Sequence, residues 1–410
     1  MKIVVTGYGT TGDTQPLIAL THGLQQAGHQ VVLATDEGAV ASAARLGLDC
    51  RVLAGSARTV VTEGSHGWAE TVKSGRPSMQ LMVQVARMNT KAWIETIDAA
   101  TDGADVIVAT TLTVYHAASV AQQRGIRVVF GQLQPSLATK DYPPPLSGLM
   151  GAPAWMNRPL AEFMATVGDL TYRGATNKAR HELRQPRLRL VWEELPVLAA
   201  WSPTLVPPSA DWSHPDVTVT GPWLPPADDA WQPPDDLTEF LDAGEPPIYV
   251  GFGSMAGMDT RPLRDAIFDG LSDRRVLLSA GWADLTDLAL PENVHPIGWT
   301  PHEWIFPLCA AIMHHCGAGT THQAARAGVP SIPVPFLGDQ PFWADRLYRL
   351  GIATPRVNPR KATSAVIREA AQRAGGTEPK TAARDLAARL SREPDGVGTA
   401  IRRIERYLQE

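Results

Sequence analysis

The chain has 410 residues, of which 44% are hydrophobic and 19% charged, and its formal net charge is −5. This length predicts roughly two to three domains with ample material for a core, and the composition is that of an ordinary globular protein. A mildly acidic chain without clustered Lys and Arg is poorly suited to nucleic acid, because such binding depends on neutralising phosphates. We therefore expect no nucleic-acid partner.

Three cysteines, Cys50, Cys309 and Cys316, form no C-x-x-C pair and are too few for a disulfide framework. No stretch approaches the about 18 consecutive apolar residues of a membrane-spanning helix, and no signal peptide is recognisable. We expect a cytoplasmic protein without a membrane span and leave open a peripheral membrane contact. Arg outnumbers Lys 30 to 7, which indicates a GC-rich bacterial genome.

Short β-branched stretches alternate with helical patterns in the first half of the chain. Residues 2–6 and 30–35 have strand patterns and flank a helical pattern over 14–26. Strand patterns recur at 105–110 and 126–131, again around a helical stretch. This β-α-β-α alternation predicts a parallel sheet covered on both faces.

The alternation stops in a proline-rich stretch, 206–236, which we assign to an interdomain linker because prolines oppose helices and central strands. It then restarts with strand patterns at 247–252, 275–280, 310–313 and 331–335. The sequence thus predicts an α/β protein of two tandem Rossmann-like domains, 1–205 and 237–395. A final amphipathic helix in 396–410 is expected to pack back on the first domain.

Residues 135–172 mix prolines with Met, Trp, Leu and Phe. They admit two interpretations. One is a buried loop followed by a core helix, and the other is an adaptable apolar pocket for an irregular ligand.

The N-terminal loop Gly7-Tyr8-Gly9-Thr10-Thr11-Gly12 fits the dinucleotide fingerprint G-x-G-x-x-G, and Asp36 stands where a ribose-binding acid belongs. Asp13 opposes this interpretation, because a carboxylate at the helix N-terminus would repel a pyrophosphate. It also replaces the lysine of a P-loop. The loop is therefore expected to hold no phosphate. Asp13 is either a helix N-cap or a base that points into a cleft.

A phosphate site is expected in the second domain instead. A strand pattern ends in His314-His315, and the small residues Cys316-Gly317-Ala318-Gly319-Thr320 then open a helix. Backbone N–H groups and the positive end of the helix dipole can bind an anion there. His314 is expected to be structural and His315 functional, since neighbouring strand residues point to opposite faces. The glycine turn Gly251-Phe252-Gly253-Ser254 is expected to face the same cleft.

The stretch from Trp299 to Gln340 resembles the nucleotide-sugar box of family 1 glycosyltransferases, which have the two-domain GT-B fold with both domains facing a cleft. Asp13 followed by Pro16 also resembles the family, whose members carry a catalytic His or Asp three residues before a Pro. The motifs HHCGAGTT and GDQPFW are most similar to those of sterol glucosyltransferases.

The resemblance implies a role for each matching residue. Asp13 is the catalytic base and Trp299 stacks on the donor base. Asp339 and Gln340 bind the donor sugar. The remaining donor contacts, chiefly to the diphosphate, are Ser254, His315, Gly317, Gly319 and Thr320. Gln323 stands where many members have a ribose-binding Glu, which leaves UDP and TDP both open as carriers.

The implied activity is inverting, metal-independent transfer of a hexose, with glucose the first choice, from a nucleoside diphosphate sugar to a lipophilic alcohol such as a sterol or triterpenoid. The main alternative is a TDP-deoxysugar transferase that decorates a macrolide or glycopeptide antibiotic. An NAD-dependent oxidoreductase and a non-catalytic nucleotide-sugar binder are more remote. No H-E-x-x-H or D-x-D pattern occurs, so we expect no metal and no cofactor, the nucleotide sugar being a substrate.

Overall fold

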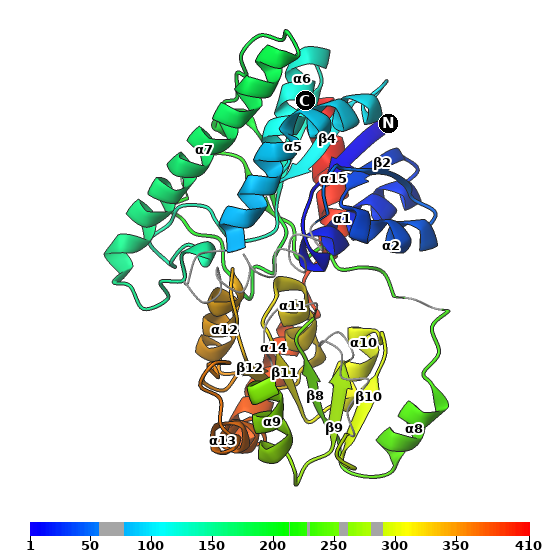
Figure 1. The fold of residues 1–410 in the computed structure, drawn as a ribbon, viewed down its shortest axis with the longest axis vertical. Helices are drawn as coiled ribbons and strands as arrows, with labels where there is room; N and C mark the ends of the chain where they lie inside the picture. The colour runs from blue at the N-terminus through cyan, green and yellow to red at the C-terminus, as the bar shows by residue number, and fades with distance from the viewer. Residues whose placement is uncertain (57–77, 213, 228–229, 254–260, 280–289) are drawn as a thin grey trace. The chain divides into compact units, whose positions relative to one another are not determined.

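The computed structural model describes residues 1–56, 78–212, 214–227, 230–253, 261–279 and 290–410 (Figure 1). They form two compact units, which are described separately. The first comprises Met1–Pro225 with Pro394–Glu410, and the second comprises Pro226–Glu393. Within the described part of the chain, no helix is long and apolar enough to cross a bilayer.

A seven-stranded sheet forms the centre of the first unit, in the order β3-β2-β1-β4-β5-β6-β7, and its strand pairs are parallel (Figure 1). In this register Ile3 of β1, an interior strand, lies opposite Val31 on one side and Val106 on the other. The strands are β1 (Lys2–Thr6), β2 (Gln30–Thr35), β3 (Asp49–Val52), β4 (Val106–Thr110), β5 (Arg127–Gln132), β6 (Val197–Ala199) and β7 (Val217–Val219).

Successive residues of β1 enter two different cores, because side chains alternate across a strand. Val4 joins the core formed with α5 (Ser78–Ala100), α6 (Val114–Arg124) and α7 (Asn157–Glu182). Ile3 and Val5 join the core formed with α1 (Thr11–Gln26) and α15 (Gly396–Gln409). The shorter elements of this unit are η1 (Glu37–Ala39), α2 (Val40–Arg45), η2 (Pro145–Ser147), η3 (Ala154–Met156) and η4 (Trp192–Glu194).

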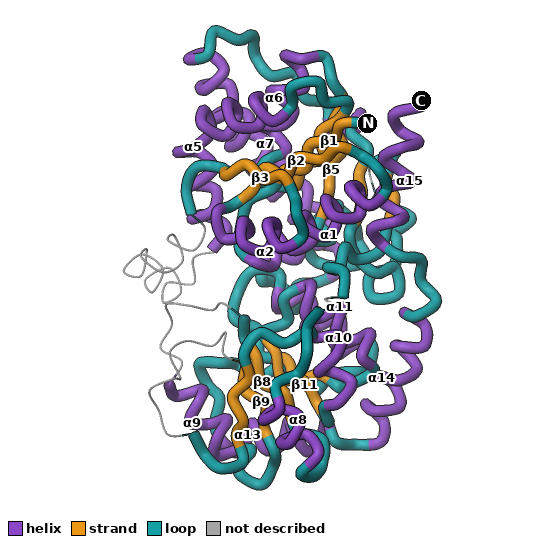
Figure 2. Tube along the Cα trace, turned by 90° about the vertical axis from the view of Figure 1, so that its right-hand side faces the viewer, coloured by secondary structure: helices purple, strands orange, loops and turns teal. Residues whose placement is uncertain are grey.

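The second unit repeats this plan around a five-stranded parallel sheet of order β10-β9-β8-β11-β12. Figure 2 shows α9 and α13 on one side of that sheet and α10, α11 and α14 on the other. The strands are β8 (Ile248–Gly251), β9 (Val276–Ser279), β10 (Val294–Ile297), β11 (Ala311–His314) and β12 (Ser331–Pro333). The helices are α8 (Asp235–Asp242), α9 (Arg261–Gly270), α10 (His302–Ile305), η6 (Phe306–Leu308), α11 (Ala318–Ala327), α12 (Gln340–Arg349), α13 (Ser364–Ala374) and α14 (Thr377–Leu390).

These two parallel sheets confirm the predicted α/β class with two Rossmann-like domains. The sequence patterns do not predict the short strands β3, β6, β7 and β10. The assignment of 206–236 to a linker needs correction, because Val217–Val219 pairs with β6 inside the first sheet. This strand lies at the sheet edge, where one neighbour suffices and nearby prolines are tolerated.

The last helix, α15, returns to the first unit and packs on α1, as Figure 1 shows. Ala400 and Ile404 are completely buried in that unit's second core. Its first residue, Gly396, lies so close to the chain at Gly221–Pro222 that a Cβ there would sit 2.3 Å from the Pro222 carbonyl oxygen. A backbone atom cannot move aside as a flexible side chain can, so this position requires glycine.

We predict that Gly396→Ala destabilises the first unit by roughly 1–3 kcal/mol, the usual range for overpacking. The matched control is Gly174→Ala, on α7, where a new Cβ would meet nothing within 4 Å. Because alanine favours helices over glycine, the control is expected to unfold at an equal or higher temperature. Thermal unfolding of both variants checks this, and an unchanged melting temperature for Gly396→Ala would contradict the close packing.

Candidate active site

The glycine loop after β1 leads directly into α1, and Asp13 closes that turn. Its Oδ2 accepts hydrogen bonds from the Thr10 N–H at 3.0 Å and from the Thr10 hydroxyl at 3.2 Å. A Cβ on Gly9 would come within 2.3 Å of the same oxygen. The carboxylate is thus folded back over the loop by a capping box, in which Thr10 is the N-cap and Asp13 the third helical residue.

This geometry bears on one of the two alternatives for Asp13, the helix cap, and leaves the catalytic base as a prediction. Asp13 does cap the helix, but from the third helical position and not as the N-cap residue. Thr10, which was not among the predicted site residues, orients the carboxylate through both of these hydrogen bonds. The T-x-x-D spacing from Thr10 is the signal that could have revealed it.

Asp36, the proposed ribose-binding acid of the dinucleotide interpretation, caps η1 by accepting the Gly38 N–H at 2.8 Å. Only 2% of Asp36 is exposed, so it is not a solvated acid at the strand end. A buried capping carboxylate is poorly placed to bind ribose hydroxyls. Together with Asp13 at the helix N-terminus, it argues against a dinucleotide site.

In the second unit, the candidate residues follow strands of one parallel sheet, whose carboxyl ends lie at one edge. Phe252, after β8, lies 5.5 Å from Phe336, after β12, measured between ring centroids. Asp339 lies near Cys316, whose thiol pKa is raised first by burial and also by this carboxylate. The loops after β8, β11 and β12 therefore converge.

His314 ends β11 and is completely buried. Its Nδ1 accepts the Cys316 N–H at 3.2 Å, so Nε2 carries the proton and donates to the Ser331 hydroxyl at 3.1 Å. Burial lowers its pKa to about 3, which keeps the ring neutral. These bonds hold Cys316 at a φ of +64°, which non-glycine residues rarely adopt. His314 is structural, as the sequence predicted.

His315 faces the two glycine turns. Its Nε2 lies 2.6 Å from where a Cβ of Gly317 would be, and its ring lies 3.4 Å from the corresponding position of Gly253. Burial lowers its pKa to about 4, although the Gly251 backbone acts in the opposite direction. The imidazole is therefore neutral at pH 7 and can donate one hydrogen bond to a ligand.

The helix that follows, α11, begins at Gly317 as its N-cap, and no side chain caps that end. An uncapped N-terminus leaves the first N–H groups open to an anion and adds the positive end of the helix dipole. Gly319 is exposed and Thr320 half-buried in this first turn. Gln323, also half-buried, lies three residues after Thr320 and so on the same helix face.

Trp299 lies in the turn between β10 and α10 with 62% of its surface exposed, so it is not a core residue. His302, three residues later, was not among the predicted site residues. Its ring stacks on Phe306 at 4.3 Å, and its Nε2 lies 3.5 Å from the Tyr249 hydroxyl. Burial, with a further contribution from His315, lowers its pKa to about 4. The neutral imidazoles of His302 and His315 thus lie near each other. Their spacing in the sequence does not indicate this proximity.

Asp339 and Gln340 form the turn into α12. Asp339 accepts a hydrogen bond from the Trp343 indole at 2.8 Å, and burial raises its pKa while that bond opposes the shift. Gln340 is 7% exposed, and its carbonyl accepts the backbone N–H groups of Phe336 and Leu337. Gln340 is therefore part of the turn's framework, with its carbonyl oxygen engaged in the turn itself.

Ser254 lies outside the described residues. Within the ranges that the structure describes, no group of three or more His, Cys, Asp or Glu side chains could hold a metal ion.

Two family models match the chain. Residues 3–128 match the glycosyltransferase family 28 N-terminal domain, and residues 273–400 match the C-terminal domain of erythromycin biosynthesis protein CIII-like proteins. The first match lies in the first unit and the second match lies mainly in the second unit. The end of the second match extends into α15, which belongs to the first unit.

Curated relatives extend over the whole chain. The vancomycin aglycone glucosyltransferase of Amycolatopsis orientalis is 31% identical over 424 residues, which cover 98% of this chain and 96% of that protein. The sterol 3-beta-glucosyltransferase UGT80B1 of Arabidopsis thaliana is 30% identical, covering 100% of this chain and 68% of that protein. The chain spans only 26% of the sterol 3-beta-glucosyltransferase of Debaryomyces hansenii, at 31% identity.

Solved structures share the fold. The glycotransferase of kitacinnamycin superposes with a TM-score of 0.72 at 20% identity, covering 99% of this chain and 98% of that one. The spinosyn forosaminyltransferase SpnP superposes with a TM-score of 0.71 at 17% identity over the whole of both chains.

We predict opposite effects for the two adjacent histidines. His314→Ala removes the partners of the Ser331 hydroxyl and the Cys316 N–H and leaves a cavity, so it should destabilise the protein by about 2–4 kcal/mol. His315→Ala should leave the melting temperature nearly unchanged but weaken UDP binding about tenfold, with little effect on uridine, since a hydrogen bond to a charged group is lost.

Thermal unfolding and titration calorimetry with UDP and uridine check both effects. Equal losses of UDP and uridine affinity in His315→Ala would exclude a contact with the diphosphate. A normal melting temperature for His314→Ala would exclude the structural role of that ring.

Proposed function

Because the chain belongs to the family 1 glycosyltransferases of GT-B fold, we propose that it transfers a hexose from a nucleoside diphosphate sugar to the hydroxyl of a lipophilic acceptor. The observation that carries this proposal is the uncapped N-terminus of α11 beside the neutral imidazole of His315. Such a site suits a diphosphate that gains charge as it leaves.

Asp13 is the proposed general base. As the acceptor oxygen attacks the anomeric carbon, the bond from that carbon to the β-phosphate oxygen breaks and the hydroxyl proton passes to Asp13. One displacement inverts the anomeric configuration. The two hydrogen bonds from Thr10 fix the direction in which the carboxylate faces.

The leaving diphosphate is the proposed ligand of the α11 N-terminus. Preorganised N–H dipoles and the His315 imidazole stabilise its developing charge without a metal ion. Trp299, exposed on the turn before α10, offers its indole face to the nucleotide base. Asp339 is proposed to bind hydroxyl groups of the donor sugar. Gln340 is proposed to hold the turn that positions Asp339 through its side-chain carbonyl, and to bind the sugar through its side-chain N–H groups.

A lipophilic acceptor fits the surface of the segment that the sequence analysis singled out, 135–172. Tyr142 and Tyr172 of this segment are buried and several of its large apolar side chains, such as Leu160 and Met164, are half-buried, but five others are exposed. The exposed ones are Leu149, Trp155, Phe163, Val167 and Leu170. The first interpretation, a core helix, therefore fails for the start of α7, and we propose that this exposed surface contacts the acceptor.

Glucose is the proposed sugar and UDP the first choice of carrier. A TDP-deoxysugar remains the second candidate, because Gln323 replaces the ribose-binding Glu. A solved neighbour, the glycosyltransferase VinC, is a complex with DTDP. All three cysteines are unpaired, which fits the proposed cytoplasmic location.

We predict that Asp13→Asn lowers kcat by roughly 10²–10⁴-fold, the range for loss of a general base, with the donor KM nearly unchanged. Thr10→Ala is the control, because it removes one contact to Asp13 but keeps the carboxylate, and it should lose less than about tenfold in kcat. Near-normal turnover of a folded Asp13→Asn would reduce Asp13 to a capping residue.

The donor and acceptor are tested together. UDP-glucose, TDP-glucose and a TDP-deoxysugar are each incubated with cholesterol and with vancomycin aglycone, and products are identified by mass spectrometry and the anomeric coupling constant. We expect the highest kcat/KM for UDP-glucose with cholesterol, and a β-linked product. Preference for the deoxysugar would assign the protein to antibiotic glycosylation, and an α-linked product would exclude inversion.

A further inference from the structure

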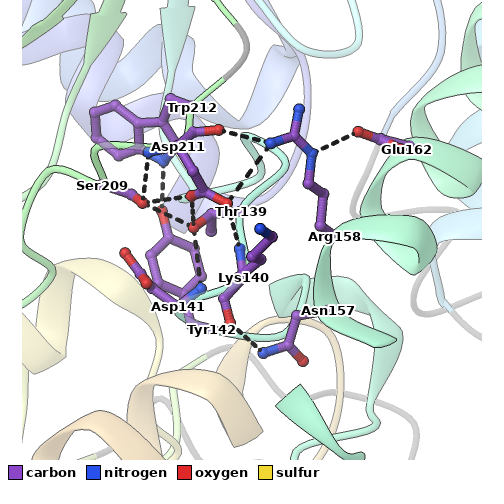
Figure 3. Close-up of polar contacts among 10 residues, drawn as sticks. All are labelled: Thr139, Lys140, Asp141, Tyr142, Asn157, Arg158, Glu162, Ser209, Asp211 and Trp212. Atoms are coloured by element: carbon purple, nitrogen blue, oxygen red, sulfur yellow. Dashed lines mark hydrogen bonds and ion pairs between the residues drawn. The ribbon is translucent and has the colours of Figure 1, made fainter. Parts of the chain in front are cut away.

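One carboxylate, that of Asp211, joins both ends of the chain segment between β5 and α7 (Figure 3). At the start of the segment, Asp211 Oδ1 accepts the Thr139 hydroxyl at 2.5 Å and Oδ2 accepts the Lys140 N–H at 3.0 Å. At its end, Arg158 donates to the Asp211 backbone carbonyl at 3.1 Å and lies 3.7 Å from Oδ2.

Further contacts strengthen this clamp. Asn157 donates to the Lys140 carbonyl at 2.9 Å, which links the two ends directly. The Trp212 indole donates to the Tyr142 hydroxyl at 3.2 Å, and the Ser209 hydroxyl donates to Asp211 Oδ1 at 2.6 Å. The Ser209 and Thr139 hydroxyls lower the pKa of Asp211 to about 2, so the carboxylate stays charged near neutral pH.

The segment that is held in this way, residues 141–156, contains only the short turns η2 and η3. Its backbone hydrogen bonds are local, such as Ser147 N–H to Pro144 and Ala152 N–H to Leu149. A segment with so few ladder bonds depends on its ends for a fixed shape. The segment carries Leu149 and Trp155, which are 48% and 74% exposed. A ligand can bury these two side chains well only if the segment holds them in a fixed position.

We propose that Asp211 is a positioning residue for the acceptor, because it fixes the ends of segment 141–156 and so presents the apolar side chains of that segment. This inference rests on the proposed function. This role requires no contact of Asp211 with the donor or the reacting atoms. It acts through Thr139, Lys140 and Arg158.

The test compares Asp211→Asn with Asp216→Asn. Asp216 pairs with Arg403 of α15 at 2.6 Å in the same unit but makes no described contact with the segment, so it controls for the loss of a surface carboxylate. Asp211→Asn keeps the side-chain shape and removes the charge that Lys140 and Arg158 face. Thr139→Val, which deletes one donor to Asp211, is the second variant should Asp211→Asn not fold.

Hydrogen exchange over 141–156 and steady-state kinetics with UDP-glucose and cholesterol are measured for each protein. In Asp211→Asn, or in Thr139→Val to a lesser degree, we expect faster exchange confined to 141–156. We also expect an acceptor KM raised about tenfold, because charge-assisted hydrogen bonds are lost. The donor KM and the rate of UDP-glucose hydrolysis measured without acceptor should stay at the wild-type level, and Asp216→Asn should match wild type throughout.

Unchanged exchange in the segment would overturn the clamp. Faster exchange with an unchanged acceptor KM, or with an equal rise in the donor KM, would overturn the positioning role. If the wild-type protein transfers no sugar, the proposed function fails and the positioning role fails with it. Exchange in Asp211→Asn would then still show separately whether the clamp exists.

Discussion

Parallel strand pairing is the constraint on which both units depend. In a parallel sheet the carboxyl ends of the strands share one edge, so the loops that leave those ends gather there whatever their separation in sequence. In the second unit this brings the turns after β8, β11 and β12 together, although Gly251 and His314, which end β8 and β11, are 63 positions apart in sequence (314 − 251). The same edge of the first sheet carries the turn after β1 and therefore Asp13.

The two units use a helix N-terminus in opposite ways. In the first unit, Asp13 caps α1 from the third helical position, so the positive end of that helix already has a carboxylate beside it. In the second unit, Gly317 begins α11 without a side-chain cap, and the positive end stays open. Since like charges repel, the first end disfavours a diphosphate and the second favours one.

The neutral state of the histidines in the second unit follows from burial. His302, His314 and His315 all have a pKa lowered by desolvation to about 3 or 4, so none carries a charge at neutral pH. A neutral ring can donate one hydrogen bond and accept another, which lets His314 organise the strand end through two partners. It also means that an incoming anion meets oriented dipoles in place of a fixed positive charge, and such dipoles need little reorganisation.

Much of the fold, and the local geometry of the candidate site in the second unit, could be predicted from sequence, because those features depend on local patterns. Alternating strand and helix periods determine the α/β class, and small residues after a strand mark the open end of α11. The opposite environments of His314 and His315 follow from strand alternation. The edge strands β3, β7 and β10 escaped prediction, since they are short and β7 lies among prolines. What supports each of these edge strands is its one neighbour, the preceding strand of the chain, and a pairing between two strands is not visible in the local pattern of either one.

Contacts between distant segments were decided by the tertiary structure alone. The spacing of His302 does not reveal its proximity to His315, because the segments after β10 and β11 must both fold before the rings approach. The burial of Asp36 and the exposure of the apolar side chains on α7 likewise depend on which surfaces other elements cover. Asp211 is the clearest case. It lies in a stretch that the sequence marks as a linker, yet it binds Thr139 and Arg158, which are 72 and 53 residues away. Sequence periodicity reports on neighbours within a helix or strand, whereas a side-chain clamp between irregular segments has no period and appears only when the chain has folded.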